Sequence, residues 1–204
     1  MDPRPEDPRP ALLEQLVLPA VTVGETGPGS GSPTALFASG RTDAGAMAQV
    51  LEHLYGLGHR RISSLRAEAQ RLGLGPGQVR SVATDYSDAE GAQATRRILA
   101  EAEAEPPTAI VYDNDVMAVA GVGAASELGI PVQGGLSVVA WDDSALCRAT
   151  RPRLTALVRD TAGFGRLAAE ELLAVLAGGP PRSRESERPR LEPRESTAPP
   201  SAAY

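Results

Sequence analysis

Two polar clusters in the sequence have side chains that could do chemistry, and each directly follows an apolar run. Asp113, Asn114 and Asp115 follow "TAIVY", while Asp142 and Asp143 follow "LSVVAW". Carboxylates and amides at neighbouring strand ends supply the hydrogen-bond acceptors and donors that a polyhydroxylated molecule requires. Each cluster also has a simpler explanation. Asn114 or Asp115 could cap the following helix, and the second pair could form a solvated turn.

Few other residues are suited to binding or catalysis. Trp141, the only tryptophan, adjoins the second cluster and either packs in the core or stacks against a ligand. No Ser or Cys in a nucleophile motif accompanies His53 or His59, and we expect both histidines on the surface or at helix caps. The sequence has no GxxxxGK[ST] or GxGxxG stretch to cradle a phosphate, and its carboxylates have no metal-ligand partners. We therefore expect neither an enzyme nor a bound metal or cofactor.

The composition bounds the class of protein. The 204 residues suit one medium domain or two small lobes. The net charge is −6, and an acidic chain without a basic stripe is a poor binder of nucleic acid on its own. The single Cys147 excludes an intramolecular disulfide, and we expect a buried, inert thiol. Neither a signal pattern nor a membrane-spanning apolar run is present, so we expect a cytoplasmic protein with no membrane contact.

Strands alternate with helices along the chain. Strands are predicted over residues 18–24, 34–38, 61–65, 79–85, 108–112, 136–141 and 154–158. Helices are predicted from Thr42 or Asp43 to Gly58, over 66–72, from Ser87, over 116–128 and from Asp160. This alternation predicts an α/β fold with a parallel sheet. Ligands bind such sheets beyond the carboxyl ends of the strands, so we expect Asn114 and Asp142 to project from one edge of adjacent, parallel strands.

Several stretches match motifs of a known family. "PTAIVYDNDVMAVAGVGAASELGIPVQGGLSVVAWDDS" contains a PTA strand, an NDxMA turn, an ELGxxVP-like segment and a VVG(F/Y)DD-like strand end. "GAMAQVLEHLYGLGHRRIS" lies upstream, and "RPRLTALVRDTAGFGRLAAEELLAVLAG" and "RESTAPP" lie downstream. In this order, and over roughly residues 11–200, the stretches resemble the lactose-repressor and galactose-repressor family of bacterial transcription regulators.

The resemblance implies a type I periplasmic-binding-protein-like core that holds a small effector, a sugar or nucleoside, in a cleft between two lobes. Asn114 and Asp142 match the family's ligand-contacting Asn and Asp by position. Asp115 matches the residue that caps the following helix, and Asp143 matches a second, more structural Asp. The family's ligand-binding Arg lies in a loop that is contracted here. Arg66 is the candidate to replace it, although the contraction argues against that role.

The resemblance also predicts how the chain is divided. We expect a nearly complete C-terminal effector-binding lobe over 39–147, a partial N-terminal lobe over 11–38 and 148–178, and largely unstructured Pro- and Arg-rich tails over 1–10 and 179–204. Pro193 interrupts the family's terminal strand. No helix-turn-helix precedes Ala11, so we expect no operator binding by this chain alone.

The leading hypothesis is an effector-binding domain of a lactose-repressor-type regulator. The alternatives are a stand-alone sugar-binding or interaction protein and a degenerate fragment without a ligand. The resemblance implies that the first strand and helix units of the family's N-terminal lobe are absent, which would leave apolar surface exposed. The expected partners are therefore a small-molecule effector and a second copy or an intact relative. Operator DNA would be a partner only through a headpiece.

Overall fold

The computed structural model shows two compact units. The described residues are 12, 21–23, 35–37, 40–66, 79–100, 106–180, 182, 184 and 186–201. Unit 1 comprises residues 1–45 and 159–189, and unit 2 comprises residues 46–158 and 190–204. The predicted 1–10 tail and, beyond Arg66, the predicted helix over 66–72 lie outside the described residues. Within the described part, no helix combines the length and apolar character needed to cross a membrane.

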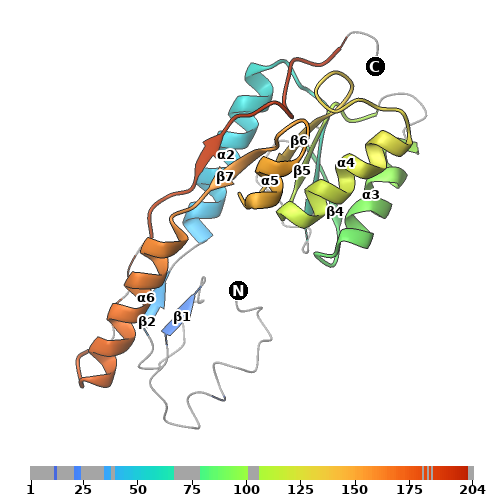
Figure 1. Cartoon of the computed structure of the whole chain (residues 1–204). Coiled ribbons are helices and arrows are strands. Elements are labelled where there is room, and N and C mark those ends of the chain that lie inside the picture. The colour runs from blue at the N-terminus through green and yellow to red at the C-terminus, as the bar shows by residue number, and fades with distance from the viewer. Residues whose placement is uncertain are drawn as a thin grey trace. The chain divides into compact units, whose positions relative to one another are not determined.

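Unit 1 contains a two-stranded parallel sheet and a helix. β1 (Val21–Val23) pairs with β2 (Ala35–Phe37), and α6 (Thr161–Leu176) packs against both strands (Figure 1). The Asp160 carboxylate accepts a hydrogen bond from the Gly163 N–H at 2.8 Å, so α6 begins where the sequence predicts.

Unit 2 is built on a six-stranded sheet with the strand order β4-β3-β5-β6-β7-β8. The strands are β3 (Ile62–Arg66), β4 (Val79–Ala83), β5 (Ala109–Tyr112), β6 (Ser137–Ala140), β7 (Thr155–Val158) and β8 (Arg190–Glu192). All of them pair in parallel except β8, which runs antiparallel to β7. The predicted α/β class is confirmed, and so is the adjacent, parallel placement of the two strands that precede the polar clusters.

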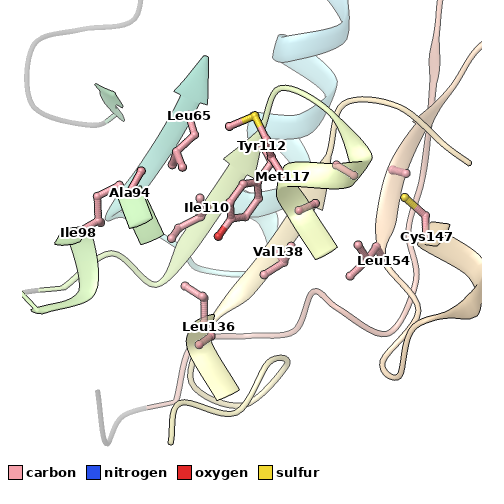
Figure 2. Close-up of a cluster of buried hydrophobic side chains, with 14 residues drawn as sticks. Leu65, Ala94, Ile98, Ile110, Tyr112, Met117, Leu136, Val138, Cys147 and Leu154 are labelled. Carbon is pink, nitrogen blue, oxygen red and sulfur yellow. The ribbon is translucent and has the colours of Figure 1, made fainter. Parts of the chain in front are cut away.

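Helices cover both faces of this sheet (Figure 1), and the buried side chains of β3, β5, β6 and β7 are divided between two cores, one on each face. The helices are α2 (Gly40–Gly56), α3 (Asp88–Ala100), α4 (Asp115–Glu127) and the short α5 (Ala145–Ala149). Ile110 and Tyr112 of β5 pack in the core beneath α3 and α4 (Figure 2). Ala109 and Val111 pack in the core beneath α2. Burying one large aliphatic side chain contributes about 1.5–3 kcal/mol, so these two cores fix the strands that carry the polar clusters.

The residues 190–201, here called the C-terminal strap, are a structured part of unit 2. The Ser196 carbonyl accepts from the Val138 N–H at 2.9 Å, and the Ser196 N–H donates to the Arg153 carbonyl at 3.0 Å. Its hydroxyl donates to the Val138 carbonyl at 2.6 Å and accepts from the Thr155 N–H at 2.8 Å. The prediction of a largely unstructured tail is therefore wrong for the strap. Backbone hydrogen bonds, which composition does not reveal, fix it to the sheet.

Two further boundaries are set by strand pairing. β8 ends immediately before Pro193, as expected for a residue that interrupts the strand. Residues 148–158, predicted to lie in the smaller lobe, belong to unit 2, because β7 pairs with β6.

One close contact joins β5 to the helices above it. Tyr112 is fully buried, and its hydroxyl forms a hydrogen bond with Thr95 Oγ1 at 2.8 Å. Thr95 Oγ1 in turn donates to the Gly91 carbonyl at 2.7 Å. The Tyr112 ring reaches the backbone of α4 at Gly121, where a Cβ atom would overlap it. The strand end that precedes the first polar cluster is thus held by α3 and α4 together.

Candidate functional site

The pairing of β5 with β6 brings the two polar clusters to the same edge of the sheet. Tyr112 lies opposite Ala140 in the register of these parallel strands. Asn114 and Asp142 each lie two residues beyond that pair, so both follow the carboxyl ends of adjacent strands. This is the edge at which parallel α/β sheets bind ligands. The structure therefore supports the expected common edge for these two residues.

Asn114 is held by two hydrogen bonds. Its Oδ1 accepts from the Met117 N–H at 2.7 Å and caps α4, while its Nδ2 donates to the Tyr86 carbonyl at 2.9 Å. The residue types left the cap open between Asn114 and Asp115, and the resemblance implied Asp115, which is wrong. Asp115 is the first residue of the helix, and its carboxylate accepts from the N–H of the next residue, Val116, at 2.9 Å. The Asn114 amide is consequently fixed in orientation before any ligand arrives.

Asp143 is held by two arginines. Arg194 of the strap donates to Oδ1 at 2.8 Å and to Oδ2 at 3.0 Å, and Arg148 donates to Oδ2 at 2.7 Å. Burial by itself raises the pKa of Asp143, but the hydrogen bonds and charges of the two arginines outweigh it, so the pKa lies below the ordinary 3.8. Ser144, not Asp143, caps α5, through its Oγ and the Leu146 N–H.

The remaining cluster residues differ in exposure. Asp142 is exposed, whereas Asp113 is 6% exposed and its N–H donates to the Leu65 carbonyl at 3.0 Å. Trp141 is also 6% exposed and packs in the core beneath α2, beside residues such as Val139. Trp141 thus packs in the core, which is one of its two predicted roles. Stacking of its ring against a ligand stays a prediction.

Tyr86 is a candidate that the sequence analysis missed. It lies in the loop between β4 and α3, also beyond the carboxyl end of a strand, and it is 50% exposed. Its backbone has a φ of 71°, a left-handed conformation that costs a residue with a side chain about 1–3 kcal/mol. The Asn114 side chain and an adjoining turn, in which Asp85 Oδ1 accepts from Ser87 N and Oγ, hold this loop. Tyr86 therefore combines an exposed aromatic side chain with a backbone carbonyl that binds Asn114, which makes it a candidate to contact a ligand.

The other predicted residues have structural surroundings. Arg66 is the last residue of β3, and its side chain lies outside the described part. His59 is 1% exposed, contrary to the expected surface position, because its ring bonds to Thr108 Oγ1 at 2.8 Å and to the Ala198 carbonyl at 3.0 Å. His53 is partly buried and bonds to Thr197 Oγ1 at 3.0 Å. Cys147 is buried as predicted, and burial raises the pKa of its thiol.

The arrangement is suited to hydrogen bonding and stacking with a neutral ligand. Among the described residues, no group of three or more His, Cys, Asp or Glu side chains is placed to hold a metal ion. Asn114 offers donors and acceptors, Asp142 offers acceptors, and Tyr86 offers an aromatic face.

Known proteins resemble both the sequence and the fold. The periplasmic binding protein-like domain model matches residues 34–197. The crystal structure of a LacI family transcriptional regulator from Bifidobacterium animalis subsp. lactis is 33% identical and superposes with a TM-score of 0.81, covering 96% of this chain and 75% of that one. The chain belongs to the LacI family.

Two further relatives extend the comparison. The HTH-type transcriptional regulator MalR of Streptomyces coelicolor is 32% identical over 176 residues, which cover 76% of this chain and 50% of MalR. A structure of the dimeric Lac repressor is 26% identical with a TM-score of 0.68, over 81% of this chain and 64% of that one. The chain spans about half the length of MalR and matches the effector-binding region of LacI-type regulators.

Membership of the LacI family confirms the resemblance found in the sequence and the periplasmic-binding-protein-like fold. The relatives named above are transcriptional regulators. The individual ligand-binding roles of Asn114, Asp142, Trp141 and Arg66 stay predictions.

Proposed function

We propose that this chain is the effector-binding domain of a LacI-type transcription regulator and that its effector is a neutral, polyhydroxylated molecule of the sugar or nucleoside class. One observation carries the proposal. In a chain of this family, Asn114 and Asp142 lie at equivalent positions beyond the carboxyl ends of the paired strands β5 and β6.

Each of three side chains has a distinct part in this proposal. Asp142 accepts hydrogen bonds from ligand hydroxyls, since a carboxylate is an acceptor only. Asn114 uses one hydrogen of Nδ2 and one lone pair of Oδ1 within the protein, and an amide has a second of each for the ligand. Tyr86 packs its ring against the apolar face of a sugar or base. Because the cap and the Tyr86 carbonyl already orient Asn114, binding costs little side-chain entropy.

Self-association is part of the same proposal. α4 is apolar on most of its surface: one face packs on the sheet through Met117 and Ala118, while Val116 is 42% exposed. The neighbouring α5 presents Leu146, which is 46% exposed. A helix that is apolar all round is usually covered, and the Lac repressor relative is a dimer, so a second copy is the proposed cover. Operator DNA would be bound by a DNA-binding headpiece. The proposed location of the protein is the cytoplasm.

Calorimetry on a matched pair of variants tests the ligand site. A thermal-shift screen against sugars and nucleosides identifies a hit, whose affinity is then measured for wild type, Asp142→Asn and Glu52→Gln. Glu52 is an exposed carboxylate near the C-terminal end of α2, so its variant removes one negative charge away from the carboxyl ends of the strands. Losing the carboxylate leaves ligand hydroxyls poorly paired, and we expect about tenfold to a hundredfold weaker binding for Asp142→Asn.

The control variant should bind within about twofold of wild type. Equal affinity of Asp142→Asn and wild type would show that the site lies elsewhere. A screen without any hit would contradict the proposed ligand class.

A further inference from the structure

An arginine-lined hollow on unit 2 has no part in the proposed effector site. Its volume is about 650 Å³, within the range of small-molecule sites. It is lined by Gln133, Arg148, Arg151, Pro152, Arg153 and Glu195. Gln133 precedes β6, and residues 151–153 precede β7, so most of the lining comes from the amino ends of these strands. The effector site was placed at their carboxyl ends.

Two of the arginines are held by carboxylates. Arg153 Nε donates to both carboxylate oxygens of Glu195, at 2.8 and 3.0 Å, and the Arg153 N–H donates to the same carboxylate at 3.2 Å. Arg148 donates to Asp143, which also binds both terminal nitrogens of Arg194. These contacts fix the guanidinium groups in place. They neutralise them only in part, because Asp143 is shared by two arginines.

Arg151 is held without a carboxylate. Its Nη1 donates to the Thr150 carbonyl at 2.7 Å and more weakly to the Ala149 and Arg148 carbonyls, at 3.4 and 3.5 Å. No ion pair of Arg151 occurs among the described residues. Its charge is therefore unneutralised, while the carbonyls at the end of α5 orient the guanidinium.

The local charge is opposite in sign to that of the whole chain. The lining residues include Arg148, Arg151, Arg153 and Glu195, and Arg148 pairs with Asp143, which also binds Arg194. These four guanidinium groups and two carboxylates leave two positive charges in excess. The chain as a whole carries a net charge of −6. A hollow with excess positive charge raises the local concentration of anions, even on a protein whose net charge is negative.

We propose that this hollow binds a small polyanion through its phosphate or carboxylate groups. Guanidinium groups form paired hydrogen bonds with both kinds of oxyanion, and such charge-assisted bonds are about twice as strong as neutral ones. Arg151 is the main contact because no carboxylate among the described residues balances its charge. The exposed Gln133 amide at the rim adds a donor that carries no charge. The ligand is distinct from the neutral effector, and the two sites can fail independently.

Isothermal titration calorimetry with two probes tests the site and its chemistry. Inorganic pyrophosphate represents phosphate ligands and citrate represents carboxylate ligands, each titrated at millimolar concentration and constant ionic strength. We expect at least one probe to bind with one-to-one stoichiometry. The probe that binds more tightly identifies the source of the oxyanion.

Two variants and two matched controls assign the binding to the hollow. Arg151→Gln removes the unbalanced charge, and Gln133→Glu adds a negative charge at the rim without removing an ion pair. Arg97→Gln and Gln93→Glu make the same charge changes at exposed positions of α3. We expect each hollow variant to weaken binding about tenfold and each control to stay within about twofold of wild type.

Circular dichroism verifies that all four variants are folded. The inference is overturned if neither probe binds to wild type. It is also overturned if the controls weaken binding as much as the hollow variants, because the effect would then reflect net charge alone.

Discussion

Replacing Gly121 by alanine tests how closely α4 approaches β5. A Cβ atom at Gly121 would overlap the Tyr112 hydroxyl and ring, with Cε1 at 2.7 Å. Neither partner can move away easily: Tyr112 is fully buried, and its hydroxyl is bonded to Thr95. The same substitution at Gly123, two residues along the helix, meets no atom within 4 Å.

Opposing effects set the size of the change. Alanine in place of glycine within a helix contributes about 1 kcal/mol in its favour. Overpacking of a buried contact costs about 1–3 kcal/mol, and a displaced Tyr112 would lose a hydrogen bond to Thr95 worth about 1 kcal/mol. We expect Gly121→Ala to lower the free energy of unfolding by about 1–3 kcal/mol.

Urea unfolding followed by circular dichroism measures both variants. Gly123→Ala should be as stable as wild type or up to about 1 kcal/mol more stable, since only the helix propensity changes. The difference between the two variants isolates the clash with Tyr112. If Gly121→Ala were as stable as Gly123→Ala, α4 and β5 could not lie as close as described.

Three further predictions concern the interior and the strap. The buried Ser64 hydroxyl has no hydrogen-bond partner among the described residues, so Ser64→Ala should raise the melting temperature; a lower melting temperature would mean that the hydroxyl is hydrogen-bonded. Arg194→Ala should lower the free energy of unfolding by about 1–3 kcal/mol, because Asp143 loses its hydrogen bonds with Arg194 and retains only the one with Arg148. An unchanged urea midpoint would contradict this. Burial lowers the pKa of His53 and of His59 below 6.5, so protons bind the unfolded chain more readily. Stability should fall as the pH drops from about 7 to about 5, and a double Gln variant should flatten that slope.

The parts of the fold with a local sequence signal were predictable. β5 and β6 are short apolar runs, and the helices after them begin with polar capping residues, so both the sheet edge and its two clusters follow from the sequence. The choice of Asn114 over Asp115 as the cap was not predictable, because both residue types suit the position and one residue of register decides between them.

Features that depend on distant segments were missed. Tyr86 stands in a polar turn with no apolar pattern around it, and its contact with Asn114 joins residues far apart in the sequence. His59 is buried because the strap supplies the Ala198 carbonyl. The strap itself has the composition of a disordered tail and is fixed by backbone hydrogen bonds to Val138 and Arg153. Amino-acid composition indicates how much apolar surface a segment can bury, but it does not indicate backbone hydrogen bonds to a distant strand.

The strap also determines the order in which unit 2 can be assembled during synthesis. Ser196 satisfies backbone groups of Val138, Arg153 and Thr155, yet it is translated after the whole 159–189 segment of unit 1. A nascent chain that has emerged only as far as β7 therefore exposes an unpaired strand edge, which is a site for aggregation and for chaperone binding. Closing this long loop is a late step, so unit 2 should complete its fold slowly for its size, and only after the strap has left the ribosome.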